Sequence, residues 1–345
     1  MAALPDELAV LPYGGSAEIL VEALSSLHLS GALFLRAEFS SPWALETSES
    51  DMLARLLVPG GRHLILFHVV LRGRLVVSLD GVEEELRPGD VAILPHAERH
   101  VLRSPAEAPP VPLAQLLPPH PWERLPALRH GGGGERTSIA CGHLYSDALH
   151  LSPVLTAMPE LIVVRPEGPG FRQWLTTNVR FALDETEARA GAHDLLMQRL
   201  PELLFVKCLD VYARRHGPEC KGWLAAAADP IVGRALAAMH QHPAKSWTLE
   251  SLARACATSR SVLDERFRRL LGCAPMRYLT SWRLQLAARK LRTSTASVGR
   301  IADEVGYDTI ASFSRAFKRH SGVSPQVWRA RPVTNRGDRG RASGP

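Results

Sequence analysis

A motif that occurs twice near the C-terminus, about 50 residues apart, constrains the fold of this chain more than any other feature. In the second copy, IADEVGYDTIASFSRAFKRHSGVSP over 301–325, apolar residues at helical spacing form two short faces on either side of Gly306. Glycine suits the left-handed turn that ends a helix, and Asp308 or Thr309 can cap the helix that follows. The motif therefore predicts a helix-turn-helix.

The first copy runs from Leu252 to Pro275 and aligns with the second after a shift of 49 residues, with a one-residue slip in the turn. Between the copies, TSWRLQLAARKLRTS over 280–294 predicts an uninterrupted helix that holds the two units at a fixed separation. Two recognition helices on one connecting helix can enter successive stretches of the major groove, about 34 Å apart.

The distribution of charge agrees with a polyanionic partner at the C-terminal end. From Ala226 onward there are 21 Lys and Arg residues against 8 Asp and Glu residues, whereas residues 1–225 have 20 against 27. The overall charge of +6 therefore conceals a basic segment attached to an acidic one. A basic segment around a helix-turn-helix indicates DNA as the partner.

The cysteines and the apolar runs predict a soluble protein of a reducing cytoplasm. An odd number of widely spaced cysteines without a CxxC pair argues against a disulfide framework. They are Cys141, Cys208, Cys220, Cys256 and Cys273. The apolar run over 64–71 is interrupted by a histidine and is far too short to span a membrane, so we expect no membrane partner.

The first half of the chain predicts a small β-structure. We expect a short amphipathic helix over 20–27, a strand over 32–39, and then consecutive antiparallel strands over 63–101. The Asp80-Gly81 pair and the turn over 88–90 mark the hairpins. A β-barrel or jelly roll is the economical arrangement for such strands.

A stretch rich in proline and glycine over 104–135 is expected to be irregular or mobile. The chain then re-enters the barrel, and helical periodicity follows over 171–181 and 195–212. Pro201 should either kink the second of these helices or mark the first turn of a new one. We expect this helical segment to connect the domains and to dimerise the protein.

The segment from Pro230 to about Arg331 resembles the AraC/XylS family of bacterial transcription regulators. The resemblance rests on the paired repeat, the WRL..AA..L helix and the terminal GYDTIASFSRAFKRHSGVSPQVWR. It implies a protein of the bacterial cytosol that associates with the nucleoid. It also implies recognition helices over 260–270 and 309–320. It also implies base contacts from Ser261, Asp264, Glu265, Ile310, Ala311, Ser312, Ser314 and Arg315. We expect phosphate contacts from Arg268, Arg269, Lys318 and Arg319.

Two acidic residues in the first recognition helix have three possible roles. Asp264 and Glu265 could repel phosphates, accept a hydrogen bond from a cytosine amino group, or pair with Arg268 or Arg269 one turn later. The second helix carries Arg315 at its centre and has no acidic residue. We therefore expect the two helices to contribute unequally to sequence recognition.

The strand region resembles the cupin family. Gly89, Asp90, Pro95 and His100 match much of its second motif, and His68 stands where the first motif places a histidine. The HxH pair and the later glutamate of the first motif are absent. Zn²⁺ or another divalent metal prefers imidazole and thiolate ligands. The candidate ligands are His68, His96, His100, Cys141 and His143. The alternative is that His68 is a satisfied core histidine and that His96 and His100 are surface residues.

The sequence thus predicts an α+β protein of two domains. The expected parts are a cupin-like effector-binding domain over 1–155, a helical linker over 156–225, a DNA-binding domain over 226–332 and a disordered tail over 333–345. The predicted function is a dimeric, non-enzymatic transcription regulator, by resemblance an activator that contacts RNA polymerase, controlled by a small-molecule effector. The alternatives are a metal-dependent cupin enzyme fused to a DNA-binding unit and an architectural DNA binder. A small molecule that changes DNA affinity without being consumed would distinguish them.

Overall fold

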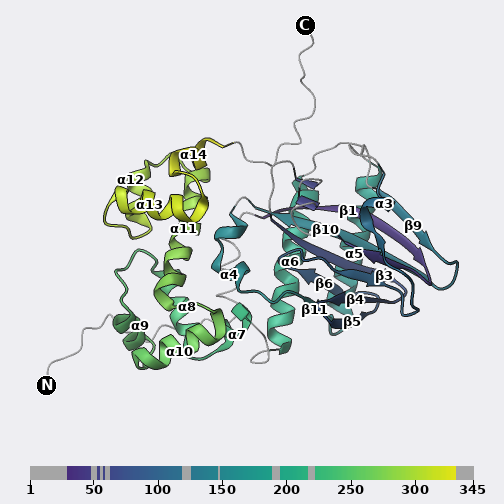
Figure 1. Cartoon of the computed structure of the whole chain (residues 1–345), viewed down its shortest axis with the longest axis horizontal. Helices are drawn as coiled ribbons and strands as arrows, with labels where there is room; N and C mark the ends of the chain where they lie inside the picture. The colour runs from purple at the N-terminus through teal and green to yellow at the C-terminus, as the bar shows by residue number, and fades with distance from the viewer. Residues whose placement is uncertain are drawn as a thin grey trace, which may run out of the picture. The chain divides into compact units, whose positions relative to one another are not determined.

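A computed structural model describes residues 29–47, 53–54, 57–58, 63–118, 126–146, 148–188, 195–216 and 222–331. The helix predicted over 20–27 and the tail predicted over 333–345 lie outside the described residues. The chain forms two compact units (Figure 1). We call Leu29–Asp147 with Glu160–Tyr212 the barrel unit, and Ala148–Pro159 with Ala213–Arg331 the helical unit.

The barrel unit contains two sheets. The six-stranded sheet has the order β11-β6-β3-β10-β1-β9, and the five-stranded sheet has the order β5-β4-β7-β2-β8. The strands are β1 (Ser30–Ser40), β2 (Ala44–Glu46), β3 (Leu64–Arg72), β4 (Leu75–Leu79), β5 (Val82–Leu86), β6 (Val91–Leu94), β7 (Val101–Arg103), β8 (Val111–Pro112), β9 (Ala127–Gly131), β10 (Arg136–Tyr145) and β11 (Ile162–Val164).

Alternating side chains from both sheets fill the interior between them. Leu64 and Leu66 of β3 join Leu75 and Val77 of β4 in one buried cluster. The predicted hairpin is confirmed, because Asp80 and Gly81 have φ angles of 47° and 81° and connect β4 to β5. The β-rich fold predicted from the alternation over 63–101 is therefore confirmed.

The described parts of the stretch over 104–135, residues 104–118 and 126–135, are more ordered than their proline content predicts. They contain β8, the short helix α3 (Leu113–Leu116) and β9, which pairs in parallel with β1. After β9, the run of glycines forms a tight turn that leads into β10. There the amides of Gly132 and Gly134 donate to the carbonyls of Ser40 and Ser41.

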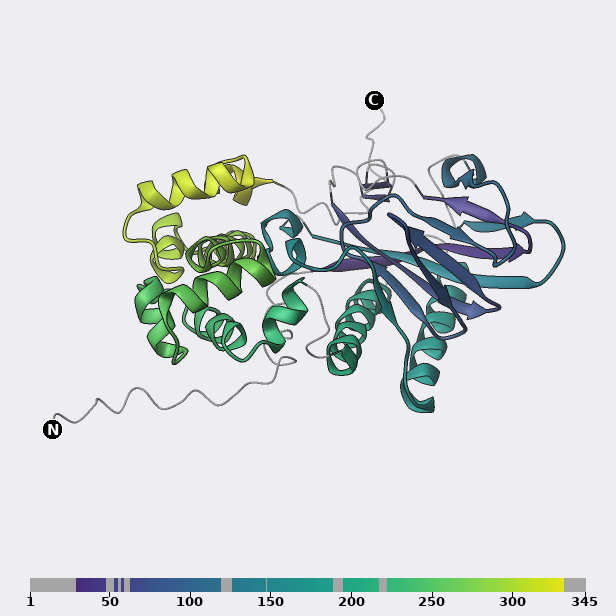
Figure 2. The same ribbon diagram turned by 60° about the horizontal axis from the view of Figure 1, so that its bottom comes forward.

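Two helices follow the strands in the chain and pack on the outer face of the six-stranded sheet (Figure 2). The helix α5 (Pro169–Ala188) contacts β1, and α6 (Leu195–His216) approaches β1 so closely that a Cβ at Gly31 would lie 2.6 Å from Pro201. Pro201 lies inside α6, so the helix continues through the proline. Leu175 and Val179 are buried on the sheet side of α5.

The helical unit carries the two repeats. Its elements are η1 (Leu149–Leu151), α4 (Pro153–Thr156), α7 (Gly222–Ala228), α8 (Val232–Gln241), α9 (Leu249–Ala255), α10 (Arg260–Leu271), α11 (Pro275–Thr293), α12 (Val298–Glu304), α13 (Ile310–Ser321) and α14 (Pro325–Ala330). None of the described helices combines the length and the apolar composition needed to cross a membrane.

One segment of the helical unit comes from the middle of the sequence. We call Ala148–Pro159 the arm, because the chain enters it from β10 and leaves it for β11. Leu151 of the arm is 1% exposed and belongs to the apolar cluster of α11, α12 and α13. The Ala157 carbonyl accepts a hydrogen bond from the Trp223 amide of α7 at 2.6 Å. The arm therefore crosses the domain boundary expected at residue 155 and contacts both halves of the unit.

Candidate nucleic-acid interface

The two helix-turn-helix motifs repeat the same backbone features. The turn of the first contains Ala257 at φ 51°, and the turn of the second contains Gly306 at φ 86°. Side chains cap both recognition helices, since Ser259 accepts from the Val262 amide and Thr309 accepts from the Ser312 amide. The helices end at left-handed glycines, Gly272 and Gly322. The predicted repeat, with Thr309 rather than Asp308 as the cap, is therefore present at the level of the backbone.

Apolar residues at equivalent positions lock each motif onto the connecting helix α11. Leu252, Leu263 and Phe267 are buried in the first motif. In the second motif the corresponding residues Ile301, Phe313 and Phe317 are each 0% exposed. At about 1.5 Å per residue, the 19 residues of α11 span roughly 28 Å. That length suits two helices that enter successive major-groove segments.

The second recognition helix, α13, presents small and basic residues. Ile310, Ala311 and Arg315 are exposed, and Ser312 and Ser314 are half-buried. Ile310 is 55% exposed, a high value for a large apolar side chain. An exposed apolar residue beside serines and an arginine suits contact with thymine methyl groups and base edges.

The first recognition helix, α10, has a different surface. The Arg268 Nε donates to the Asp264 carboxylate at 2.7 Å, one helical turn apart, and this bond raises the pKa of Arg268. Of the three roles considered for Asp264, the structure contains the intrahelical ion pair. Glu265 and Ser261 are exposed. One of the base-contact residues predicted for α10, Asp264, is thus already paired with Arg268.

The basic residues of the helical unit divide into two groups. Arg283 donates to the carbonyls of Pro243 and Lys245, and Arg266 pairs with Asp229 at 3.1 Å, so both hold the fold together. Within the described part of the chain, the side chains of Arg269, Arg315 and Lys318 have no hydrogen-bond or ion-pair partner. Basic side chains that have no partner within the protein are available to bind the phosphates of DNA.

One basic cluster was not found from the sequence. Burial together with the charges of Arg277 and Arg319 lowers the pKa of His320, so these three groups lie close together at the meeting of α11 and α13. Like charges that repel one another are stabilised when an anion binds between them. Arg277 lies on the connecting helix α11 and not on a recognition helix, so the repeated motif does not mark it as a DNA contact.

A hydrogen-bonded chain connects three of the five proposed metal ligands inside the barrel unit. His68 faces Cys141 with Nδ1 at 3.0 Å and His100 with Nε2 at 2.8 Å. The His100 Nδ1 lies 2.7 Å from the Glu98 carbonyl. That carbonyl requires a proton on His100 Nδ1, which leaves Nε2 to accept from His68 and leaves His68 Nδ1 to accept from the Cys141 thiol.

In this network of hydrogen bonds, the neutral side chains of Cys141, His68 and His100 bond to one another and to a backbone carbonyl, and they do not surround a common point as metal ligands would. Burial lowers the pKa of His100 to about 4 and raises that of the Cys141 thiol. His96 is half-buried in the turn after β6. No group of three or more possible ligands in the described residues can hold a metal ion. The interpretation of His100 as a surface residue is wrong, since it is 1% exposed, whereas His68 is a satisfied core histidine.

Comparison with known proteins agrees with both units. The cupin family matches residues 18–213, more than half of the chain, and a helix-turn-helix domain matches residues 252–331. An AraC-like transcription regulator of Streptomyces lividans is 33% identical and covers 81% of this chain and 94% of its own. The chain belongs to the AraC family of DNA-binding transcription regulators, with a cupin-type N-terminal domain.

Two further relatives differ in how much of the chain they cover. The transcriptional regulator AlkR of Acinetobacter baylyi is 29% identical over 90% of this chain and 99% of its own. Among solved structures, the DNA-binding domain of AdpA in complex with a target DNA is 34% identical. It covers 30% of this chain and 91% of that one, with a TM-score of 0.29.

Proposed function

We propose that this regulator binds promoter DNA as a dimer and that a small-molecule effector in the barrel unit controls its affinity for DNA. The observation that carries the proposal is the pair of equivalent helix-turn-helix motifs on α11, joined in one chain to a unit of the cupin type. By resemblance to the family, the bound protein activates transcription through RNA polymerase. Effector control requires different ligand affinities for the DNA-competent and incompetent states.

The arm supports a mechanical route for this control. It contributes Leu151 to the core of the second motif and the Ala157 carbonyl to α7 of the first half. Its two ends continue directly into β10 and β11 of the barrel unit. A ligand that shifts those strands would act on both recognition helices through one covalent segment.

The outer face of α5 supports the proposed dimer. Trp174 is 39% exposed and Phe181 is 45% exposed, and they are seven positions apart in the sequence, so both lie on one face of the helix. Phe171 stacks on Trp174 with ring centroids 5.7 Å apart. Exposed aromatic residues in a row favour association with a second copy.

Selection of duplexes from a random pool by the full-length protein tests the DNA-binding part of the proposal. We expect enriched sequences with two conserved blocks about one helical turn apart, and two such sites in tandem or inverted order if the protein is a dimer. Sedimentation of the Trp174→Ser and Phe181→Ser variants tests the dimer separately. Selected sites with a single conserved block would contradict reading by two helices.

A further inference from the structure

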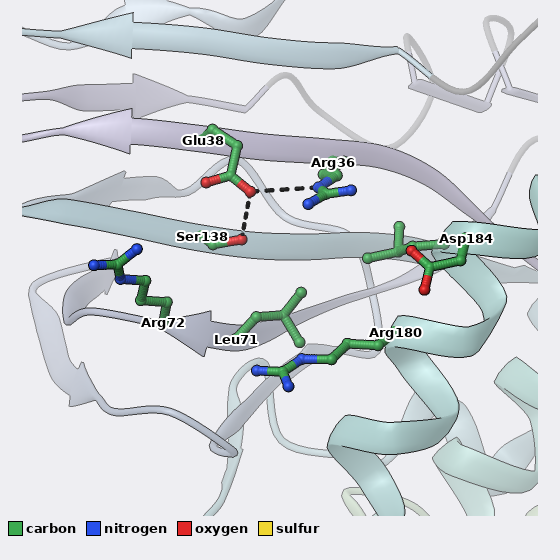
Figure 3. A pocket seen from close by; sticks show the side chains of 8 residues that line it. Arg36, Glu38, Leu71, Arg72, Ser138, Arg180 and Asp184 are labelled. Atoms are coloured by element: carbon green, nitrogen blue, oxygen red, sulfur yellow. Dashed lines mark hydrogen bonds and ion pairs between the residues drawn. The ribbon is translucent and has the colours of Figure 1, made fainter. Parts of the chain in front are cut away.

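A pocket of about 320 Å³ opens on the outer face of the six-stranded sheet beside α5 (Figure 3). It lies wholly within the barrel unit and outside the packed interior between the two sheets. Three strands and one helix contribute to it. The lining residues are Arg36, Glu38, Leu71, Arg72, Ser138, Arg180, Leu183 and Asp184. Its volume is at the lower end of the range for small-molecule sites.

One of its three arginines is already neutralised. The Arg36 Nε lies 3.3 Å from the Glu38 carboxylate, and the Ser138 hydroxyl donates to the same oxygen at 2.8 Å. Both bonds are visible in Figure 3. They fix Glu38 on the sheet, with its charge balanced by its neighbour two residues away.

The other two arginines have no such partner within the described residues. Arg72 ends β3, and Arg180 extends from α5 past Leu71 and away from Asp184 (Figure 3). The two guanidinium groups thus come from a strand and from the helix packed beside it. Guanidinium forks match a carboxylate in both geometry and charge.

The balance of charge selects the kind of anion. Arg36, Arg72 and Arg180 face Glu38 and Asp184, which leaves one net positive charge in the lining. A dianion such as phosphate would meet repulsion from both carboxylates. Leu183 is buried and Leu71 is half-buried, so the floor of the pocket is apolar between the arginines.

We propose that this pocket binds a small organic monocarboxylate with a short apolar body. Arg72 and Arg180 hold the carboxylate, and Leu71 and Leu183 contact the apolar part. The regulatory role of this site rests on the effector control proposed above, whereas binding itself does not. A ligand that joins β3 to α5 would fix the helix that carries Trp174 and Phe181, and so would connect effector binding to dimerisation.

Calorimetric titration of the full-length protein with hexanoate, benzoate, benzamide and inorganic phosphate tests the site. We expect at least one of the two carboxylates to bind. The Arg72→Gln and Arg180→Gln variants should each weaken that binding by tenfold or more. The matched control is Arg87→Gln, because Arg87 pairs with Glu85 in the same unit, is 72% exposed and lies outside the pocket. Its affinity should equal that of the wild type.

The proposal is overturned if neither carboxylate binds, if neutral benzamide binds as tightly as benzoate, if phosphate binds more tightly, or if both pocket variants retain wild-type affinity. The bound carboxylate is then added at saturation to a DNA-binding assay. A change in DNA affinity that Arg180→Gln abolishes supports the site as the effector site. Binding that leaves DNA affinity and dimerisation unchanged supports the site and overturns its regulatory role.

Discussion

The Asp264 carboxylate accepts a hydrogen bond from Arg268 Nε at 2.7 Å on the first recognition helix, whereas Arg315 on the second helix has no such partner among the described residues. The first recognition helix thus carries an arginine that is paired with a carboxylate, whereas the second carries an arginine that is free to contact DNA. The two helices differ in charge although their backbones are equivalent.

Replacing Asp264 by asparagine should strengthen binding to nonspecific DNA. The substitution removes a negative charge and releases Arg268 to contact a phosphate, so the salt dependence should become steeper by about one counterion. Fluorescence anisotropy at several salt concentrations measures this slope. Glu250→Gln is the matched control, because Glu250 pairs with Arg254 at the same i,i+4 spacing on α9. Equal effects of the two variants would mean that only total charge matters.

Arg315→Ala and Lys318→Ala should weaken DNA binding in different ways. Arg315 lies at the centre of the exposed face of α13, so its loss should reduce discrimination by about 1–3 kcal/mol between specific and random DNA. Lys318 lies in the last turn of α13, where loss of a phosphate contact should weaken all sequences alike and flatten the salt slope by about one. Competition binding with both DNAs distinguishes the two outcomes. If both variants lose specific and nonspecific affinity equally, the division of roles is wrong.

The sequence was sufficient for the elements that depend on local signals. Helical spacing, the capping residues and Gly306 predicted both motifs and their boundaries to within a residue or two, because these features act over a few positions. Alternation and the Asp80-Gly81 turn predicted the strands for the same reason. Tail and terminal-helix predictions lie outside the described residues.

The features that the sequence did not predict depend on contacts between distant residues. Nothing local marks Leu151 as part of the core of the second motif, since a leucine after a strand suits either unit. The pocket gathers Arg72, Ser138 and Arg180 from separate elements, so no motif links them. The sequence leaves open whether His100 is buried, because the burial of a histidine depends on its partners, here His68 and the Glu98 carbonyl.

Substitutions at the two equivalent turn residues, Ala257 and Gly306, should have different effects on the free energy of unfolding. At Gly306 a Cβ would lie 2.8 Å from the backbone of Ala244, and the φ of 86° adds strain, so Gly306→Ala should destabilise the unit by more than about 1 kcal/mol. Ala257 already carries a Cβ at φ 51°, so Ala257→Gly should be neutral or slightly stabilising. Chemical denaturation of both variants measures the difference. Similar losses from both would contradict the strain argument.

The barrel unit should lose stability in mild acid. Burial lowers the pKa of His100 and His143 to about 4, below the usual pKa of about 6.5 for an exposed histidine, and lowers the pKa of His68 as well. Between these values the unfolded chain binds more protons than the folded one. The histidines' contribution to stability is therefore fully present above about pH 6.5 and is lost as the pH falls toward 4, by on the order of 2 kcal/mol at pH 5 for each of His100 and His143.

Hydrogen exchange of peptides from β3 and β10, corrected for intrinsic rates, follows this loss in the barrel unit alone. His143→Leu removes one titrating group and should make the pH dependence shallower. Leu144→Met, at the buried position next to His143 on β10, is the control and should leave the dependence unchanged. Protection that stays constant from pH 7.5 to 5 would contradict the burial of neutral histidines.

Leu151→Ala should destabilise the DNA-binding motifs although the residue lies 100 positions before them. Leu151 is 1% exposed in a cluster with Phe313, Phe317 and Trp328, and loss of its side chain leaves a cavity that typically costs about 2–5 kcal/mol. Hydrogen exchange should therefore show reduced protection in α12 and α13, and DNA affinity should fall. Val82→Ala, 54% exposed on β5, is the matched apolar truncation and should change neither. Unchanged protection of α13 in Leu151→Ala would show that the arm does not support the second motif, and the proposed route of effector control would fail with it.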